Sequence, residues 1–244
     1  MSLSILKRQL AEVVDAERAA PAPALPTGID ALDRLLPGGG GIPRGRITEV
    51  VGRGGQTTFV RRVVEEAVVR RGLWVAYVDA ARTLAPRDWA PLGAHAGFWA
   101  VRPRDPARGA WCTDVLLRSG AFALVVLDGA PPLPRPVAVR LARLAREAGA
   151  ALLVLVSDGS SAAGATTVPL PGALRLRVGP ARHVPALRDG GGGGGARRLA
   201  IAVERGGTPG AAELPYAVVM PRCLCVAPEP HDRRAGGRTT TRRR

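Results

Sequence analysis

The chain has 244 residues, which is enough for one large domain with appendages. Its three cysteines are too few for a disulfide-stabilised scaffold, and Cys223 and Cys225 lack the further ligands of a zinc site, so no metal is predicted. The net charge of +15 favours a polyanionic partner, either nucleic acid or an acidic protein, although arginines that only solvate helices would give the same excess. The absence of a secretory signal and of a long apolar stretch predicts a cytoplasmic protein that does not bind membranes.

The N-terminal residues 1–20 predict an amphipathic helix. Leu3, Leu6, Leu10 and Val13 recur at three- and four-residue spacing and form an apolar stripe. The prolines of residues 21–26 end the helix and predict a stiff, extended linker. A helix detached in this way must bury its stripe, either on its own domain or on a neighbouring subunit or partner. These four residues are therefore candidates for partner binding.

Residues 27–226 predict the core domain. A short helix capped by Thr27 is expected over residues 29–36, and longer helices over 57–71, 107–119 and 136–148. Near-continuously apolar strands are expected between them, over residues 46–51, 73–79, 98–101, 123–128 and 151–156. This alternation predicts an α/β fold in which a mainly parallel sheet carries helices on both faces.

The pattern changes after residue 158. Residues 173–178, 198–204 and 216–220 alternate polar and apolar side chains, which predicts antiparallel edge strands. Residues 189–196 include six consecutive glycines and predict a flexible loop. Four tryptophans, Trp74, Trp89, Trp99 and Trp111, are expected to anchor the core or the packing of helices on the sheet, and Trp89 and Trp99 are also interface candidates.

Residues 49–59, E-V-V-G-R-G-G-Q-T-T-F, resemble a degenerate nucleotide-binding P-loop. In the motif G-x-x-x-x-G-K-[ST], backbone N–H groups cradle phosphates and the lysine reaches the outer phosphates. Gln56 stands at the lysine position, the loop from Gly52 to Gly55 is two residues shorter than the motif, and the only lysine in the chain is Lys7. The degenerate nucleotide site predicted here comprises Gly52, Gly55, Gln56, Thr57, Thr58 and Asp128.

Three segments carry a resemblance to the bacterial RecA family. They are residues 25–52, from L-P-T-G-I-D to T-E-V-V-G, residues 77–86, Y-V-D-A-A-R-T-L-A-P, and residues 116–130, L-L-R-S-G-A-F-A-L-V-V-L-D-G-A. The resemblance extends over about residues 25–225 and implies a RecA-like P-loop NTPase core. It makes Asp128 the Walker B aspartate and Thr57 the hydroxyl that ligates magnesium. Ala81 occupies the position of the catalytic glutamate.

The losses at Gln56 and Ala81 predict a protein without catalytic residues, without ATP hydrolysis and without a cofactor, although weak binding of Mg-ATP stays open. The resemblance also implies two DNA-binding loops, and both are reduced. Asp128 is followed directly by G-A-P-P-L-P-R-P, and residues 158–174 contain neither arginine nor an aromatic residue. RecA-type recombinase activity is therefore not expected.

A compact RecA relative that lacks both active centres and carries a basic tail resembles the ImuA family of RecA/SulA-like accessory proteins. The resemblance implies a non-catalytic adaptor in SOS mutagenesis and translesion DNA synthesis. Its partners would be RecA, an ImuB-type homologue of Y-family polymerases, or both, and self-association is possible. Two alternatives stay open: an atypical ATP-dependent recombination or repair factor, and a SulA-like inhibitor of cell division.

Residues 227–244 predict a disordered, arginine-rich tail. Its candidate binding residues are Arg233, Arg234, Arg238, Arg242, Arg243 and Arg244. They would contact either the phosphates of DNA, with affinity that falls steeply with salt, or an acidic patch on a protein partner.

Overall fold

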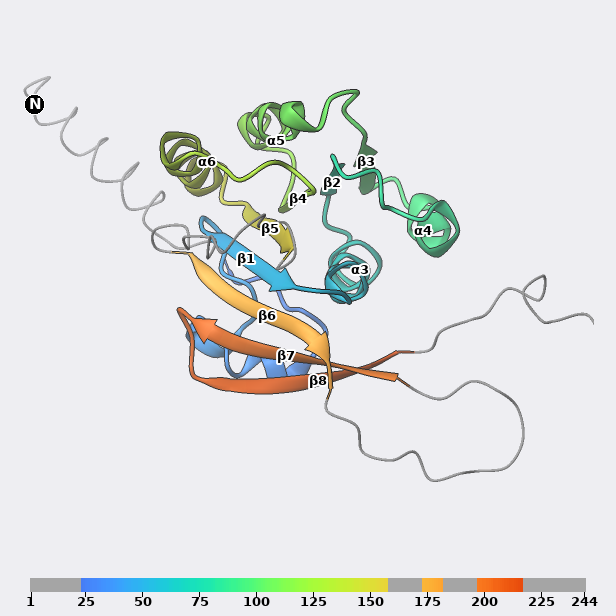
Figure 1. The fold of residues 1–244 in the computed structure, drawn as a ribbon, viewed down its shortest axis with the longest axis vertical. Coiled ribbons are helices and arrows are strands. Elements are labelled where there is room, and N and C mark those ends of the chain that lie inside the picture. Colours follow the sequence, from blue (N-terminus) through green and yellow to red (C-terminus); the bar gives the residue numbers. More distant parts are fainter. Residues whose placement is uncertain (1–22, 158–172, 182–196, 217–244) are drawn as a thin grey trace, which may run out of the picture.

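The structure, a computed structural model, describes residues 23–157, 173–181 and 197–216 (Figure 1). The predicted N-terminal helix, the glycine-rich loop 189–196 and the arginine-rich tail lie outside the described residues. The strands are β1 (Ile47–Gly52), β2 (Val75–Asp79), β3 (Phe98–Val101), β4 (Leu124–Asp128), β5 (Ala151–Ser157), β6 (Leu174–Pro180), β7 (Arg197–Arg205) and β8 (Gly210–Tyr216). The α-helices are α2 (Asp30–Asp33), α3 (Gln56–Glu65), α4 (Pro86–Gly93), α5 (Gly109–Arg118) and α6 (Arg135–Glu147). No helix in these ranges is long and apolar enough to cross a lipid bilayer.

The eight strands form one sheet in the order β3-β2-β4-β5-β1-β6-β7-β8. Every pair from β3 to β6 is parallel, and β7 and β8 continue the sheet as antiparallel strands. The predicted α/β fold is confirmed. The predictions of antiparallel strands over 173–178 and 198–204 are confirmed by the antiparallel pairing of β6 with β7, but the edge position is wrong for both, because β8 forms the edge. On its other side β6 runs parallel to β1. The polar alternation of β6 was misleading because Arg175 is only 8% exposed and pairs with the buried Glu49 rather than with water.

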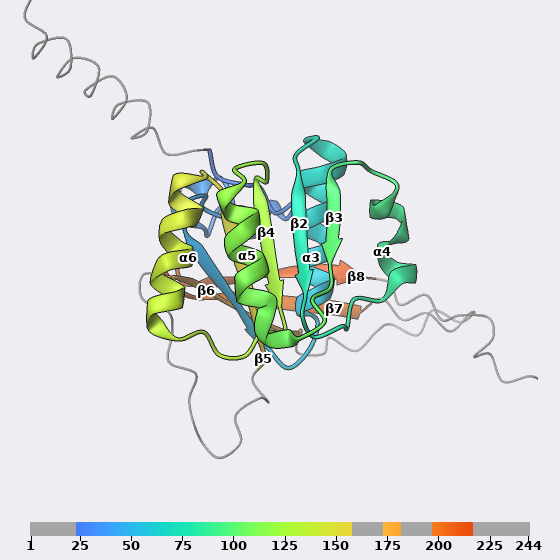
Figure 2. The ribbon, with the colours of Figure 1, turned by 90° about the horizontal axis from the view of Figure 1, so that it is seen from above.

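Helices cover both faces of the sheet, as the alternation predicted. Successive residues of a strand point to opposite faces, so Val126 of β4 packs into the core beneath α3, and Val125 packs into the core beneath α5 and α6. Helix α3 supplies Phe59, Val60 and Val63 to the first core, and α6 supplies Leu141 and Leu144 to the second. Figure 2 shows α5 and α6 in front of the strands and α3 behind them.

Several element boundaries differ from the sequence prediction. The helix expected over 29–36 is only α2, because Pro37 opens a separate 3-10 turn, Pro37–Gly39. Thr27 does not cap α2 as predicted, since Ile29 holds the N-cap position; the Thr27 hydroxyl instead accepts a hydrogen bond from the Ile29 N–H. The helix expected over 57–71 ends as a π-helical turn, Glu66–Arg70.

Two elements were missed by the sequence prediction. Helix α4 was missed because Pro91 interrupts its pattern. Strand β8 precedes the segment predicted as a strand, 216–220, and residues 217–220 lie outside the described ranges.

Only one of the four tryptophans is a core residue. Trp89 is 5% exposed and lies 4.9 Å from Tyr77 between ring centroids. The predicted core role is wrong for Trp74, Trp99 and Trp111, which are 44%, 49% and 61% exposed. Trp99 lies on the edge strand β3, and Trp111 lies on α5 on a side that no other described element covers.

Candidate functional site

The carboxyl ends of the parallel strands meet at one edge of the sheet, which is where α/β folds bind ligands. The strand register places Asp79 beside Asp128, and Gly52 beside Ser157. The predicted residues of the P-loop remnant and Asp128 therefore end at the same edge. The strands that carry them, β1 and β4, are not neighbours in the sheet, because β5 lies between them.

The side chain of Gln56, at the predicted lysine position, is turned onto the strand ends. Its Nε2 donates to the carbonyl oxygen of Val156 at 2.8 Å and to that of Val50 at 3.3 Å. Gln56 is 8% exposed and is the first residue of α3. Its amide thus bridges backbone acceptors of β1 and β5.

Two of the three glycines in the remnant are fixed by close packing against β6 and β7. A Cβ on Gly52 would lie 2.1 Å from the carbonyl oxygen of Val178, and a Cβ on Gly55 would lie 2.4 Å from Cδ2 of Leu199. Gly55 also has φ of 82°, a left-handed conformation that favours glycine. Gly54 differs, because no atom lies within 4 Å of the position of its Cβ. The glycines at 52 and 55 are therefore explained by contacts within the protein.

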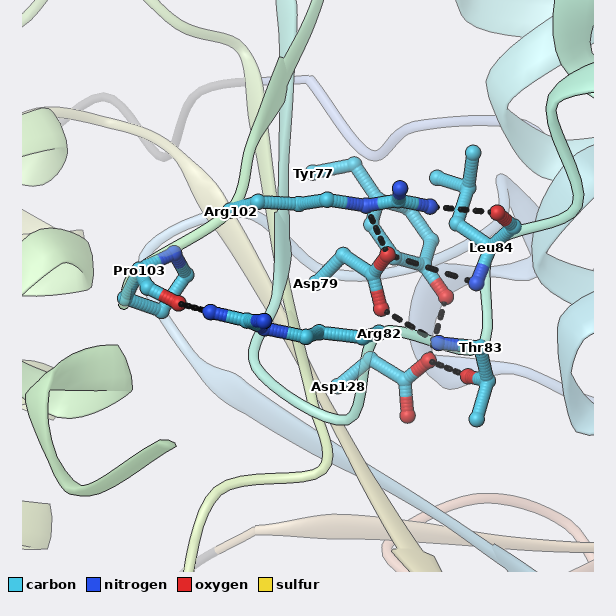
Figure 3. A network of polar contacts seen from close by, with 8 residues as sticks. All are labelled: Tyr77, Asp79, Arg82, Thr83, Leu84, Arg102, Pro103 and Asp128. Atoms are coloured by element: carbon cyan, nitrogen blue, oxygen red, sulfur yellow. Dashed lines mark hydrogen bonds and ion pairs between the residues drawn. The ribbon is translucent and has the colours of Figure 1, made fainter. Parts of the chain in front are cut away.

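Asp128, the predicted Walker B residue, is held inside a polar network at the end of β4 (Figure 3). The hydroxyl of Tyr77 donates to its Oδ2 at 2.7 Å, and the hydroxyl of Thr83 donates to the same oxygen at 3.2 Å. Burial raises the pKa of the Asp128 carboxyl, against the opposing effect of these two hydrogen bonds. Burial, followed by the charge of Asp128, also raises the pKa of the Tyr77 phenol, which therefore stays a donor.

The neighbouring acid, Asp79, is fully buried and carries a charged partner. Arg102 donates its Nε to Oδ2 of Asp79 at 2.7 Å, and the backbone N–H groups of Thr83 and Leu84 donate to the carboxylate at 3.0 and 3.3 Å. These bonds fold residues 79–84 into a loop over the end of β4 (Figure 3). Sequence reasoning missed Arg102, because only the fold brings the end of β3 to the end of β2.

Ala81, at the position predicted for a catalytic glutamate, contributes its backbone to the same loop. Its N–H donates to the carbonyl oxygen of Asp128 at 3.2 Å, and Gly129 packs so closely that a Cβ there would lie 2.1 Å from Cβ of Ala81. The next residue, Arg82, has φ of 58°, which is costly for a residue with a side chain. Its guanidinium donates to the carbonyl oxygens of Arg104 at 3.0 Å and Pro103 at 3.4 Å, which fixes this conformation.

The remaining predicted sites divide between described and undescribed residues. Thr57 and Thr58 lie in the first turn of α3, both partly buried. The stripe of Leu3, Leu6, Leu10 and Val13 and the arginines of the tail lie outside the described residues. Within the described ranges, no three His, Cys, Asp or Glu side chains are grouped as metal ligands would be.

Comparison with known proteins shows which family this chain is similar to. A sequence model of the RecA N-terminal domain matches residues 7–138. Protein RecA of Frankia casuarinae is 37% identical over 116 residues, which cover 46% of this chain and 33% of the relative. Protein RecA of Acidothermus cellulolyticus is 39% identical over 120 residues, which cover 48% of this chain and 34% of the relative. Protein RecA of Syntrophus aciditrophicus is 31% identical over 188 residues, covering 72% of this chain and 53% of the relative. The chain thus spans about a third to a half of the length of these relatives. Together with the eight-stranded sheet, the match shows that the chain belongs to the RecA N-terminal domain family and has a RecA-like core.

Proposed function

We propose that the chain is a non-catalytic RecA-like adaptor in SOS mutagenesis and translesion DNA synthesis. It acts by binding RecA, an ImuB-type homologue of Y-family polymerases, or both. The observation that carries the proposal is the position of Gln56, whose side-chain amide donates to the carbonyl oxygens of Val156 and Val50. A neutral side chain bound in this way offers no charge to the outer phosphates of a nucleotide.

The surrounding contacts support the same reading. A triphosphate needs a loop whose N–H groups surround it, and the residues here fit that need poorly, because Gly52 and Gly55 pack directly on β6 and β7. Asp128 accepts hydrogen bonds from Tyr77 and Thr83. Burial raises the pKa of its carboxyl, so the neutral form is more favoured here than in an exposed aspartate. Ala81 brings no carboxylate that could orient an attacking water.

A retained fold with a dismantled site favours a role in binding. A compact RecA-like core with both active centres reduced and a basic tail resembles the ImuA family, whose members are accessory proteins, and this resemblance supports the choice of partners. The core retains one continuous eight-stranded sheet with helices on both faces. Its surfaces, rather than its strand ends, would then carry the function.

The test is co-precipitation of the purified chain with RecA and, separately, with an ImuB-type protein. Each is done with and without ATP and single-stranded DNA. We expect at least one partner to be retained without ATP. We also expect retention to fall when Leu3, Leu6, Leu10 and Val13 are all changed to alanine, because docking of a helix buries its apolar stripe.

The matched control changes polar positions of the same segment, Lys7, Glu12 and Asp15, to alanine and should retain the partner. If the unmodified chain retains neither partner under any condition, the adaptor role is wrong. Retention that requires hydrolysable ATP would favour the ATP-dependent repair factor instead.

A further inference from the structure

The outer side of α5 and α6, called here the α5–α6 face, carries exposed apolar side chains. The two helices lie side by side in front of the strands (Figure 2). Trp111 and Val115 stand one turn apart on α5 and are 61% and 43% exposed, and Val139 on α6 is 55% exposed. They are three of the six large apolar side chains that lie exposed within the described ranges. Solvation of a helix surface requires none of them, so this face is a candidate for a binding surface.

An ion-pair network joins the two helices of this face. Arg140 on α6 donates its Nε to Oδ1 of Asp114 on α5 at 2.6 Å, and Arg118 pairs with the same carboxylate. The hydrogen bond from Arg140 lowers the pKa of Asp114 and outweighs the opposing effect of burial, and Arg118 adds to the lowering. Asp114 therefore stays charged, but two arginines already match its charge. The network also holds the apolar side chains of both helices in place before a partner binds.

Arginines flank the apolar side chains of this face. Arg135, Val139, Arg143 and Arg146 follow one another at spacings of four, four and three residues, so they share one side of α6, and all four are exposed. The guanidinium groups of Arg135 and Arg146 have neither a hydrogen bond nor an ion pair with any described residue. The remaining acid of the two helices, Glu147, lies 3.7 Å from Arg143. Five arginines against two paired acids leave the α5–α6 face positively charged.

We propose that the α5–α6 face binds an acidic amphipathic helix of a partner protein. The apolar stripe of that helix packs on Trp111, Val115 and Val139, and its carboxylates pair with Arg135 and Arg143. A helix fits better than an extended segment, because the backbone of α5 and α6 is hydrogen-bonded internally and offers no strand edge. Tryptophan and arginine are also the side chains that contribute most to protein interfaces. The inference rests on the proposed adaptor function and names one of its contact surfaces.

Charge complementarity favours this partner over other occupants of the face. A second copy docked through the same face around a two-fold axis would bring the arginines of α6 against those of its twin. The N-terminal residues 1–20 carry three basic and three acidic side chains, so they offer no net negative charge. Single-stranded nucleic acid could stack a base on Trp111, but it would leave Val115 and Val139 without an apolar partner.

The test uses fluorescence anisotropy with the full chain and a labelled four-turn helical peptide. Its leucines form one stripe, and its other positions are Glu and Ala. One comparison peptide carries Gln in place of every Glu, and the other keeps the composition but scatters the leucines around the helix. We expect the striped acidic peptide to bind at least about tenfold more tightly than either comparison peptide, because the face offers both cations and an apolar surface.

Variants of the chain locate the binding. Trp111→Ala and Arg143→Gln are each expected to weaken binding of the striped peptide by about tenfold. The matched controls Val69→Ala and Arg70→Gln remove an exposed apolar side chain and an exposed arginine from the π-helical turn Glu66–Arg70, which packs on the opposite face of the sheet. They should leave the affinity unchanged. All four positions are exposed, so every variant should unfold at the same urea concentration as the unmodified chain.

The arginine-rich tail also attracts acidic peptides. Binding that is insensitive to Trp111→Ala and Arg143→Gln but is lost on removal of residues 229–244 would overturn the proposal, and so would equal binding of the peptide with scattered leucines. Displacement of the striped peptide by single-stranded oligothymidylate, with binding of the oligonucleotide itself weakened by Trp111→Ala, would assign the face to nucleic acid and overturn it as well.

The co-precipitation experiment separates this inference from the adaptor function. Failure of the striped peptide to bind, with RecA or the ImuB-type protein still retained, would reject the α5–α6 face alone. Retention of neither protein, with the striped peptide bound as expected, would reject the adaptor function alone.

Discussion

Replacement of Arg175 by alanine is expected to lower the free energy of unfolding by about 3–5 kcal/mol, the usual cost of removing one member of a buried ion pair. Arg175 on β6 donates its Nη1 to Glu49 on β1 at 3.0 Å and its Nε to Glu204 on β7 at 3.0 Å. Glu49 is 1% exposed, so its carboxylate would lose a buried cationic partner. Glu204 also pairs with Arg177 and is partly solvated, and it would suffer less.

Urea denaturation of the variant and the unmodified chain measures this loss. The matched control is Arg198→Ala, which breaks an exposed ion pair with Glu213 and should cost no more than about 1 kcal/mol. Replacement of both Glu49 and Arg175 by methionine should be less destabilising than Arg175→Met alone, because the buried carboxylate is removed together with the guanidinium. Equal losses for Arg175→Ala and Arg198→Ala would show that the pair is not buried in solution.

The second large effect is expected at the P-loop remnant. We expect Gly52→Ala to lower the free energy of unfolding by about 2–3 kcal/mol, because the new methyl group would overlap the Val178 carbonyl oxygen and push β1 away from β6. In a loop whose glycines serve only phosphate binding, the same change would leave the stability of the ligand-free protein nearly unaltered.

Gly54→Ala is the control within the same loop. No atom of the described residues lies within 4 Å of its Cβ position, so we expect a change of no more than about 0.5 kcal/mol. Thermal or urea unfolding of the two variants compares them directly. Similar stabilities of Gly52→Ala and Gly54→Ala would contradict the close packing of the remnant on β6.

The fold was predictable from local patterns where these patterns were strong. The apolar runs of β4 and β5 alternate with amphipathic helices, and this alternation predicted the sheet and its two helical layers. The parallel pairing of β6 was not predictable from its pattern, because Arg175 reads as solvent-facing until Glu49 and Glu204 are placed around it. The exposure of Trp99 likewise depends on the position of β3 at the sheet edge.

The candidate site shows the same limit. The sequence identified Gln56, Ala81 and Asp128 as the informative positions, because a motif can be compared residue by residue. It could not show what replaces the lost chemistry. The bonds of Gln56 to Val156, 100 residues away, and of Tyr77 to Asp128, 51 residues away, form only in the folded chain.

The most direct test of a non-catalytic RecA-like core is a calorimetric titration of the full chain with Mg-ATP. We expect no saturable binding tighter than about 1 mM, which corresponds to a standard free energy of only about −4 kcal/mol. The contradicting result is stoichiometric binding in the micromolar range that Asp128→Ala abolishes and the exposed control Asp30→Ala retains.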